Sequence, residues 1–192
     1  MLTAAQKATL KAAVNANPAW AAYPNDSDGA YNLAQVLNQK ASPAFKVWRT
    51  EAPTDAIMDA IAFSSYTPND AVLSSDTDPA LSRKIGWLLT IQTKQMNLQL
   101  MVQGRQSIDA SKANVRAGLR DAVILVPAGA GGTNVSPGGA SGATVMTACL
   151  RDATEAEKIL TTGPQSTGGV TADVMGYEGS ISPQDVQEAR NS

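Results

Sequence analysis

The sequence predicts a mainly α fold, a helical bundle around a long central helix at residues 141–162, with Gly/Ser-rich insertions and room for a short β-hairpin. Ser141 suits the N-cap of that helix, and Gly163 with Pro164 suits its end. Steps of three and four residues place one apolar stripe along it. The stripe consists of Val145, Met146, Cys149, Leu150, Ala153, Ala156, Ile159 and Leu160.

The opposite face of the central helix is predicted to be exposed and charged. It carries Thr147, Arg151, Asp152, Glu155 and Lys158. The spacing allows the pairs Arg151–Glu155 and Glu155–Lys158, each contributing roughly 0.2–0.5 kcal/mol. Only 5% of the 192 residues are aromatic, so the core must consist mostly of Ala, Leu, Val, Ile and Met.

Three helices are predicted in the first third of the chain, each with a recognisable start. They are residues 3–15, capped by Thr3; residues 28–40, capped by Asp26 or Ser27; and a helix beginning at Pro53. Trp20 and Tyr23 are expected to hold the first connection onto the core. Residues 44–50 alternate in polarity and fit either a short strand or an extended arm.

A long helix is predicted to follow, beginning near Asp78 and Pro79 and ending near Gln103. One face of this helix is marked by Leu81, Ile85, Leu88, Leu89, Met96 and Leu100. Further apolar residues widen this face beyond one side of the helix. The helix must therefore either lie in the middle of the bundle or meet another subunit.

The remaining elements complete a single predicted domain, residues 1–192. A helix capped by Asp109 or Ser111 runs to Ala122, and Ser182 with Pro183 begins a final helix. Residues 64–77 and 127–140 are predicted to be flexible insertions. Residues 164–192 are expected to form a C-terminal loop and short helix, either an assembly arm or a packed helix.

Composition argues against several classes of function. The net charge is −2, with 15 basic and 17 acidic residues, which gives no electrostatic reason to expect nucleic acid or an anionic membrane as a partner. No apolar run approaches the ~20 residues of a membrane span, and residues 1–14 do not resemble a signal peptide. The single cysteine, Cys149, lies on the apolar stripe and is expected to be buried.

The sequence contains no histidine, which removes the commonest general base and metal ligand. Gly129, Gly131 and Gly132 lie too far before the next helix for a phosphate loop. Asp152, Glu155 and Glu157 are explained by a solvated face, and Asp26 and Asp28 by helix capping. Serines 64, 65, 74 and 75 have no S-x-x-K spacing and are interpreted as turn residues. We therefore predict no catalytic, cofactor-binding or metal-binding residues, and no enzyme.

Four strings of residues resemble a family of small tailed-bacteriophage virion proteins associated with the head–tail connector, or neck. They are A-A-Y-P-N-D-S-D-G-A-Y (21–31), A-S-P-A-F-K-V-W-R-T (41–50), A-T-E-A-E-K-I-L-T-T-G (153–163) and M-G-Y-E-G-S-I-S-P-Q-D-V-Q-E-A-R-N-S (175–192). Residues 64–76 and 127–140 lie outside the resemblance. These strings carry no catalytic meaning, so the resemblance transfers no active-site residues.

The resemblance implies a virion protein, assembled in the host cytoplasm, that docks beneath the portal as a ring of identical subunits, expected to number twelve. Its implied partners are its own copies, the portal protein and the adjacent neck or tail protein. The ring would give DNA a passive channel without sequence-specific contacts, and no membrane is involved. The alternatives are another virion role (capsid decoration or cement, tail completion, or assembly) and a small enzyme without histidine, which is disfavoured.

Overall fold

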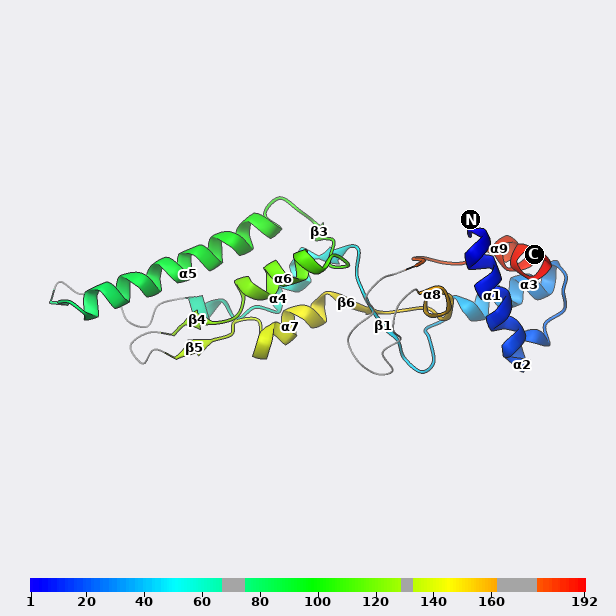
Figure 1. Cartoon of the computed structure of the whole chain (residues 1–192), viewed down its shortest axis with the longest axis horizontal. Coiled ribbons are helices and arrows are strands. Elements are labelled where there is room, and N and C mark those ends of the chain that lie inside the picture. The colour runs from blue at the N-terminus through cyan, green and yellow to red at the C-terminus, as the bar shows by residue number, and fades with distance from the viewer. Residues whose placement is uncertain (67–74, 129–132, 162–175) are drawn as a thin grey trace. The chain divides into compact units, whose positions relative to one another are not determined.

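The computed structural model describes residues 1–66, 75–128, 133–161 and 176–192 (Figure 1). It is mostly helical, with 57% helix and 10% strand, as the predicted mainly α class requires. The α-helices of these ranges are α1 (Ala4–Ala16), α2 (Pro18–Ala21), α3 (Ser27–Leu37), α4 (Thr54–Asp59), α5 (Ala80–Val102), α6 (Ala113–Ala122), α7 (Ala143–Ala148), α8 (Glu155–Leu160) and α9 (Pro183–Asn191).

Short elements complete the described part of the chain. Two 3₁₀ turns are present, η1 (Phe63–Tyr66) and η2 (Ala140–Gly142). Three two-stranded sheets pair β1 with β6, β2 with β3 and β4 with β5. The strands are β1 (Lys46–Trp48), β2 (Ala52–Pro53), β3 (Ser107–Ile108), β4 (Val126–Pro127), β5 (Asn134–Val135) and β6 (Leu150–Asp152).

The chain divides into two compact units, whereas the sequence predicted one domain over residues 1–192. Unit 1 consists of residues 1–47 and 151–192, and unit 2 of residues 48–150. Each unit has a buried apolar cluster of its own.

Unit 1 is a helical cluster in which the two ends of the chain pack together. Helix α9 contacts α1 and α3, and α8 also contacts both of those helices. Its fully buried apolar side chains include Leu10, Val14, Leu33, Leu37 and Ile181. The predicted caps are confirmed at Thr3 and at Ser182, each within a capping box, and Pro183 occupies the first turn of α9.

Residues 176–192 therefore form the packed alternative rather than a free arm. Val186 and Ala189 of α9 are fully buried, and the Leu2 backbone N–H donates to Asp185 Oδ1 at 3.0 Å. Residues 162–175, the other part of the predicted C-terminal segment, lie outside the described residues, as does the predicted helix end at Gly163.

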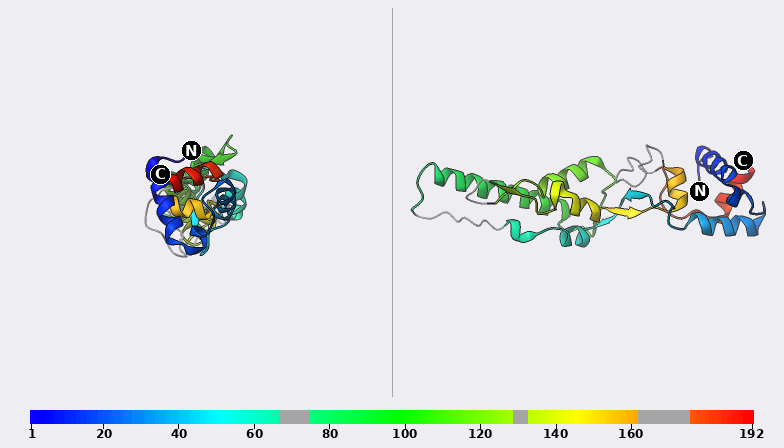
Figure 2. Two further views of the ribbon diagram at one scale, coloured as in Figure 1. Left: turned by 90° about the vertical axis from the view of Figure 1, so that its right-hand side faces the viewer. Right: turned by 90° about the horizontal axis from the view of Figure 1, so that it is seen from below.

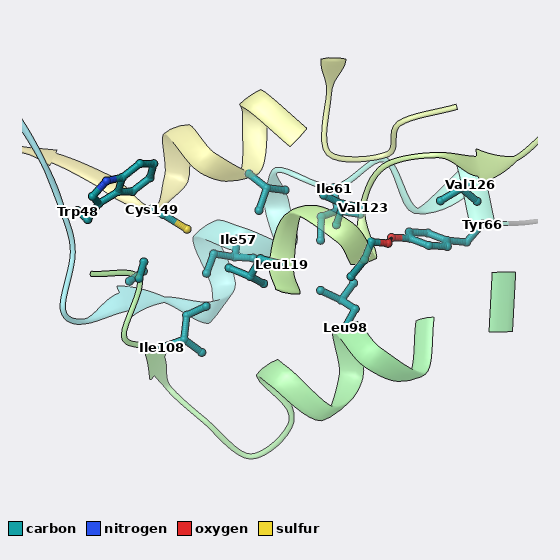
Figure 3. Close-up of a cluster of buried hydrophobic side chains, with 14 of the residues drawn as sticks. Trp48, Ile57, Ile61, Tyr66, Leu98, Ile108, Leu119, Val123, Val126 and Cys149 are labelled. Carbon is teal, nitrogen blue, oxygen red and sulfur yellow. The ribbon is translucent and has the colours of Figure 1, made fainter. Parts of the chain in front are cut away.

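Unit 2 surrounds a core to which α4, α5, α6 and α7 all contribute (Figure 3). Ile57 of α4, Leu119 of α6 and Val145 of α7 are fully buried there. Tyr66 enters from η1, and its hydroxyl donates to the Ala122 carbonyl at 2.8 Å. Burial raises the pKa of Tyr66 to about 12, so the phenol remains protonated in its role as donor.

The predicted central helix at 141–162 is wrong. Helix α7 stops at Ala148, β6 follows at Leu150–Asp152, and α8 begins at Glu155. The Ala153 N–H donates to the Phe45 carbonyl at 2.8 Å, and this sheet-like pairing removes residues 150–153 from any helix. A capping box between Thr154 and Glu157 then starts a new helix.

The apolar stripe on which that prediction rested serves two different cores. Val145 and Cys149 are buried in unit 2, while Ala156 and Leu160 are buried in unit 1. The spacing of apolar residues does not show which part of the fold covers them. Two short helices whose apolar residues continue the same spacing therefore give the same sequence pattern as one long helix.

Other predicted boundaries shift by a few residues. Pro53 precedes α4 as its N-cap and also belongs to β2, and α6 has Lys112 at its N-cap instead of Asp109 or Ser111. Ser141 does not cap a helix, because its φ is 54° and the left-handed Gly142 precedes α7. In α3, Leu33 is buried, whereas Tyr31 is 55% exposed.

The predicted insertion at 127–140 is partly ordered. Residues 129–132 lie outside the described part, but β4 and β5 pair antiparallel on either side of them. Gly138 is buried, and a Cβ built there would lie 2.4 Å from Val123 Cγ2 and 3.0 Å from Val145 Cγ2. This glycine is required by close packing. Of the other predicted insertion, 64–77, residues 67–74 lie outside the described part.

Replacing Gly138 by alanine is expected to lower the free energy of unfolding by about 1–3 kcal/mol, because the new methyl group overpacks the unit 2 core. Gly86→Ala is the matched control, since a Cβ at Gly86 of α5 meets nothing within 4 Å. The control should raise stability by about 0.5–1 kcal/mol through helix propensity. Urea unfolding followed by circular dichroism measures both, and equal effects of the two variants would contradict the packing interpretation.

Candidate assembly surface

The carboxylates considered for chemistry are used in separate ion pairs. Asp152 Oδ2 lies 2.7 Å from Lys40 Nζ, and its other oxygen pairs with Lys46. The predicted Glu155–Lys158 pair is confirmed at 3.4 Å. Within the described ranges, no group of three Asp, Glu or Cys side chains is placed to hold a metal ion.

Glu157 differs from the solvated face predicted for it, because it is only 1% exposed. Arg151, predicted to pair with Glu155, instead forms a two-pronged pair with Glu157 at 2.7 and 2.8 Å. The backbone N–H groups of Thr154 and Gly179 each donate to the same carboxylate at 2.9 Å. Glu178 adds a second contact to Arg151 at 3.0 Å. This cluster ties α8 to residues 178–179 within unit 1.

Opposing effects act on the pKa of Glu157. Burial raises it, but the hydrogen bonds from Arg151, Gly179 and Thr154 together lower it below its ordinary value. The carboxylate is therefore ionised and fully bonded, which is the pattern of a structural ion pair.

The other candidates for chemistry do not form a site in the described residues. Cys149 is fully buried, as predicted, and burial raises the pKa of its thiol to about 11. Ser64 and Ser65 lie in η1, while Ser74 and the glycine loop at 129–132 lie outside the described part. None of the helices in the described ranges is both long and apolar enough to cross a membrane.

The most unusual surface of unit 2 is one face of α5. This helix has 23 residues, roughly 35 Å in length, but only Ile91 and Leu98 are buried. Four large apolar side chains are exposed instead, Ile85 (44%), Leu89 (58%), Met96 (58%) and Leu100 (66%). We call these four residues the α5 stripe.

The α5 stripe lies on a single side of the helix. Its members are spaced four, seven and four residues apart, which places them within about 60° of one another around the axis. Ile91 and Leu98 point the opposite way, into the unit 2 core. The prediction that this helix has more than one apolar side is correct. However, the described residues of the chain cover only one of these sides.

The α5 stripe is also free of charge. The charged residues of α5 are Arg83, Lys84 and Lys94, each about 100° or more around the axis from every member of the stripe. Lys94 reaches the carbonyl of Asp121 at 2.5 Å, and Arg83 lies 5.8 Å from the centre of the Trp87 ring. The uncharged Gln92 and Gln99 complete the exposed side. Depletion of charge is the compositional mark of an interface core.

An apolar groove adjoins the C-terminal half of the α5 stripe. Its volume is about 460 Å³, and its walls are Gln95, Gln99, Val102 and Gln103 of α5 together with Met58, Phe63 and Tyr66. Phe63 is 47% exposed at its edge. The stripe and the groove together form an extended uncharged surface, which is unusual for a surface that faces only water.

No protein-family model, curated protein or solved structure matches this chain. Its function must therefore be argued from the structure itself. The two features that bear on it are the separate structural ion pairs and the long helix α5, which exposes four large apolar side chains on one face.

Proposed function

We propose that this chain is a non-enzymatic structural protein of a tailed-phage particle, a head–tail connector subunit that joins the portal to the tail as a ring of identical copies. The observation that carries the proposal is the α5 stripe. Four exposed large apolar residues on a charge-free helical face are costly in water, and they become favourable when another protein covers them.

The family resemblance supports the particular kind of assembly. The strings that carry it lie in residues 21–50 and 153–192, largely in unit 1, whereas the α5 stripe lies in unit 2. A connector subunit needs contacts with its neighbours in the ring and with the proteins above and below. A subunit that offers a long uncharged face suits that requirement.

Particle composition tests this function. Purified phage particles should contain the chain, at about twelve copies for each portal ring, when measured by quantitative mass spectrometry. Phages that lack the gene should accumulate DNA-filled heads and separate tails. Capsid decoration would instead give a copy number comparable with that of the shell protein. Particles without the chain would contradict any structural role in the virion.

A further inference from the structure

A second feature of unit 2 is a pocket of about 290 Å³ beside α6. Arg116 and Arg120 form its charged wall, and Ala113 and Ala117 lie beside them on the same face of α6. Trp48, Ser141 and Met146 close the other sides. We call this the arginine pocket.

Arg116 is fixed in place before any ligand arrives. Its Nη1 donates to the carbonyls of Ala110 at 2.8 Å and Ser111 at 2.6 Å, and its guanidinium lies 4.6 Å from the centre of the Trp48 ring. Arg120 is exposed, and its stem passes over Gly142, where a Cβ would lie 3.2 Å from Arg120 Cγ. A held guanidinium beside a free one forms a prepared site for an oxyanion.

No acidic side chain of the described residues neutralises the charge of the arginine pocket. Among the described residues, Arg151 is the one arginine with a carboxylate within 4.0 Å. Arg116 and Arg120 have none in the part of the chain that the structure describes, and no acid lines the pocket. Two like charges four residues apart on a helix destabilise it unless a partner neutralises them.

Unit 2 carries the complementary pattern on α4. Asp55 and Asp59 are also four residues apart, are exposed, and form no ion pair among the described residues. They lie on the side of α4 opposite the buried Ile57. We call them the α4 carboxylates. In both helices the two charges lie about 6 Å apart along the axis.

The two patterns lie on different helices of unit 2. Helix α7 contacts both α4 and α6. Figure 2, in its right-hand view, shows α4 (cyan) and α6 (green) on opposite sides of unit 2. Neither α4 carboxylate lines the arginine pocket of its own chain, but a second copy can present them to it.

We propose that the arginine pocket of one copy receives the α4 carboxylates of the next copy. The contact joins two different patches, so it is heterologous and generates a ring when the rotation closes. It rests on the proposed assembly into a ring and supplies the contact between neighbouring subunits. Arginine and carboxylate can pair through two hydrogen bonds, which fixes orientation as well as register.

A protein carboxylate fits the arginine pocket better than a nucleic-acid phosphate. Proteins that bind DNA without reading its sequence present a stripe of cations along the backbone. Here two arginines are enclosed with the apolar side chains of Ala113, Ala117 and Met146, which suit the methylene stem of an acidic side chain. The net charge of −2 also disfavours a DNA surface.

A charge exchange between two variants tests this contact. One variant is R116E/R120E and the other is D55R/D59R, and each is expected to assemble at least about 100-fold more weakly than the wild type, by roughly 2.7 kcal/mol. Their mixture should assemble again, because the acidic pocket of the first receives the basic α4 of the second. Mass photometry of each variant and of the mixture measures the assemblies.

Control variants separate this contact from effects on folding and net charge. Arg116 also holds backbone carbonyls, so R120E alone, which leaves those bonds intact, should still weaken assembly about 10-fold. R105E is the matched control, since Arg105 is exposed, has no ion pair in the described part of unit 2, and gives the same change in charge. It should assemble like the wild type.

Three results would overturn the proposed contact. The first is a wild-type chain that remains monomeric at every concentration measured. The second is a mixture of the two charge variants that assembles no better than either variant alone. The third is an R120E chain that assembles normally but whose particles no longer retain their DNA, which would indicate a nucleic-acid contact instead. The function and the contact can fail separately. If particles contain the chain but the charge variants assemble normally, only the proposed contact is contradicted. If particles lack the chain, only the proposed virion function is contradicted.

Discussion

The double variant L89E/L100E is expected to weaken assembly of the chain by at least about 100-fold, whether with its own copies or with the portal. Both leucines belong to the α5 stripe and are 58% and 66% exposed. In the free chain each new carboxylate remains in water, so the free energy of unfolding should change by no more than about 0.5 kcal/mol for each substitution. In the assembly each would be buried without a partner, which is strongly unfavourable.

The matched control is T90E. Thr90 is an exposed residue of α5 that lies about 80° or more around the axis from every member of the stripe. It adds a carboxylate to the same helix and should leave assembly unchanged. Analytical ultracentrifugation across a concentration series compares the three chains. If L89E/L100E assembles like T90E, then the α5 stripe faces solvent in the particle and is not a contact surface.

Glu157→Ala should lower the free energy of unfolding by about 3 kcal/mol, near the lower end of the cost of removing one partner of a buried ion pair. The variant leaves Glu178 as the carboxylate partner of Arg151 among the described residues and removes the acceptor for the N–H groups of Thr154 and Gly179. Glu178→Ala is the control, because that carboxylate is 35% exposed and its loss should cost less than about 1 kcal/mol. Guanidinium unfolding monitored by circular dichroism measures both variants.

The Glu157 cluster also gives the protein a dependence on acid. The folded state lowers the pKa of Glu157, so this contribution to stability is complete above its unfolded pKa, about 4.5. It is lost as the pH falls through the lower, folded pKa. The difference in stability between the wild type and Glu157→Ala should therefore be constant near neutral pH and shrink below about pH 4. A difference that stays constant into strong acid would mean that the charge of Glu157 contributes little.

The sequence could predict the elements whose ends are fixed by local chemistry. Thr3 with Gln6 and Ser182 with Asp185 form capping boxes, so both terminal helices are found within about one residue of their predicted starts. Helix α5 was recognisable because its apolar residues continue from Leu81 to Val102 without a glycine or proline signal strong enough to stop it.

The break at residues 149–154 depended on information that is not local. Residues 150–153 pair with the chain near Phe45, more than 100 residues earlier, and a helical period cannot report such a contact. One local signal was present and was missed: Thr154 followed by Glu157 is a capping box inside the supposed helix. Glu157 is buried because its carboxylate accepts hydrogen bonds from the Thr154 N–H of the capping box and from the Gly179 N–H. Its position on a helical face with other charges did not indicate this.

From the sequence, the α5 stripe could be predicted only as one of two alternatives. The surplus apolar residues of α5 indicated either a central helix or contact with another subunit, and only the structure distinguishes a covered side from an open one. The arginine pocket had no sequence signal apart from Arg116 and Arg120, four residues apart. The two arginines indicate a binding site only because no acidic residue lines the pocket, and that is known only from the folded unit.

We propose above all that this chain is a structural subunit whose α5 stripe is covered by protein in the assembled particle. A reconstruction of the particle neck by electron cryomicroscopy tests it most directly. We predict a closed ring of this chain between portal and tail, with Leu89 and Leu100 buried at protein contacts. A neck in which no copy appears, or in which these leucines face open solvent, would contradict the claim.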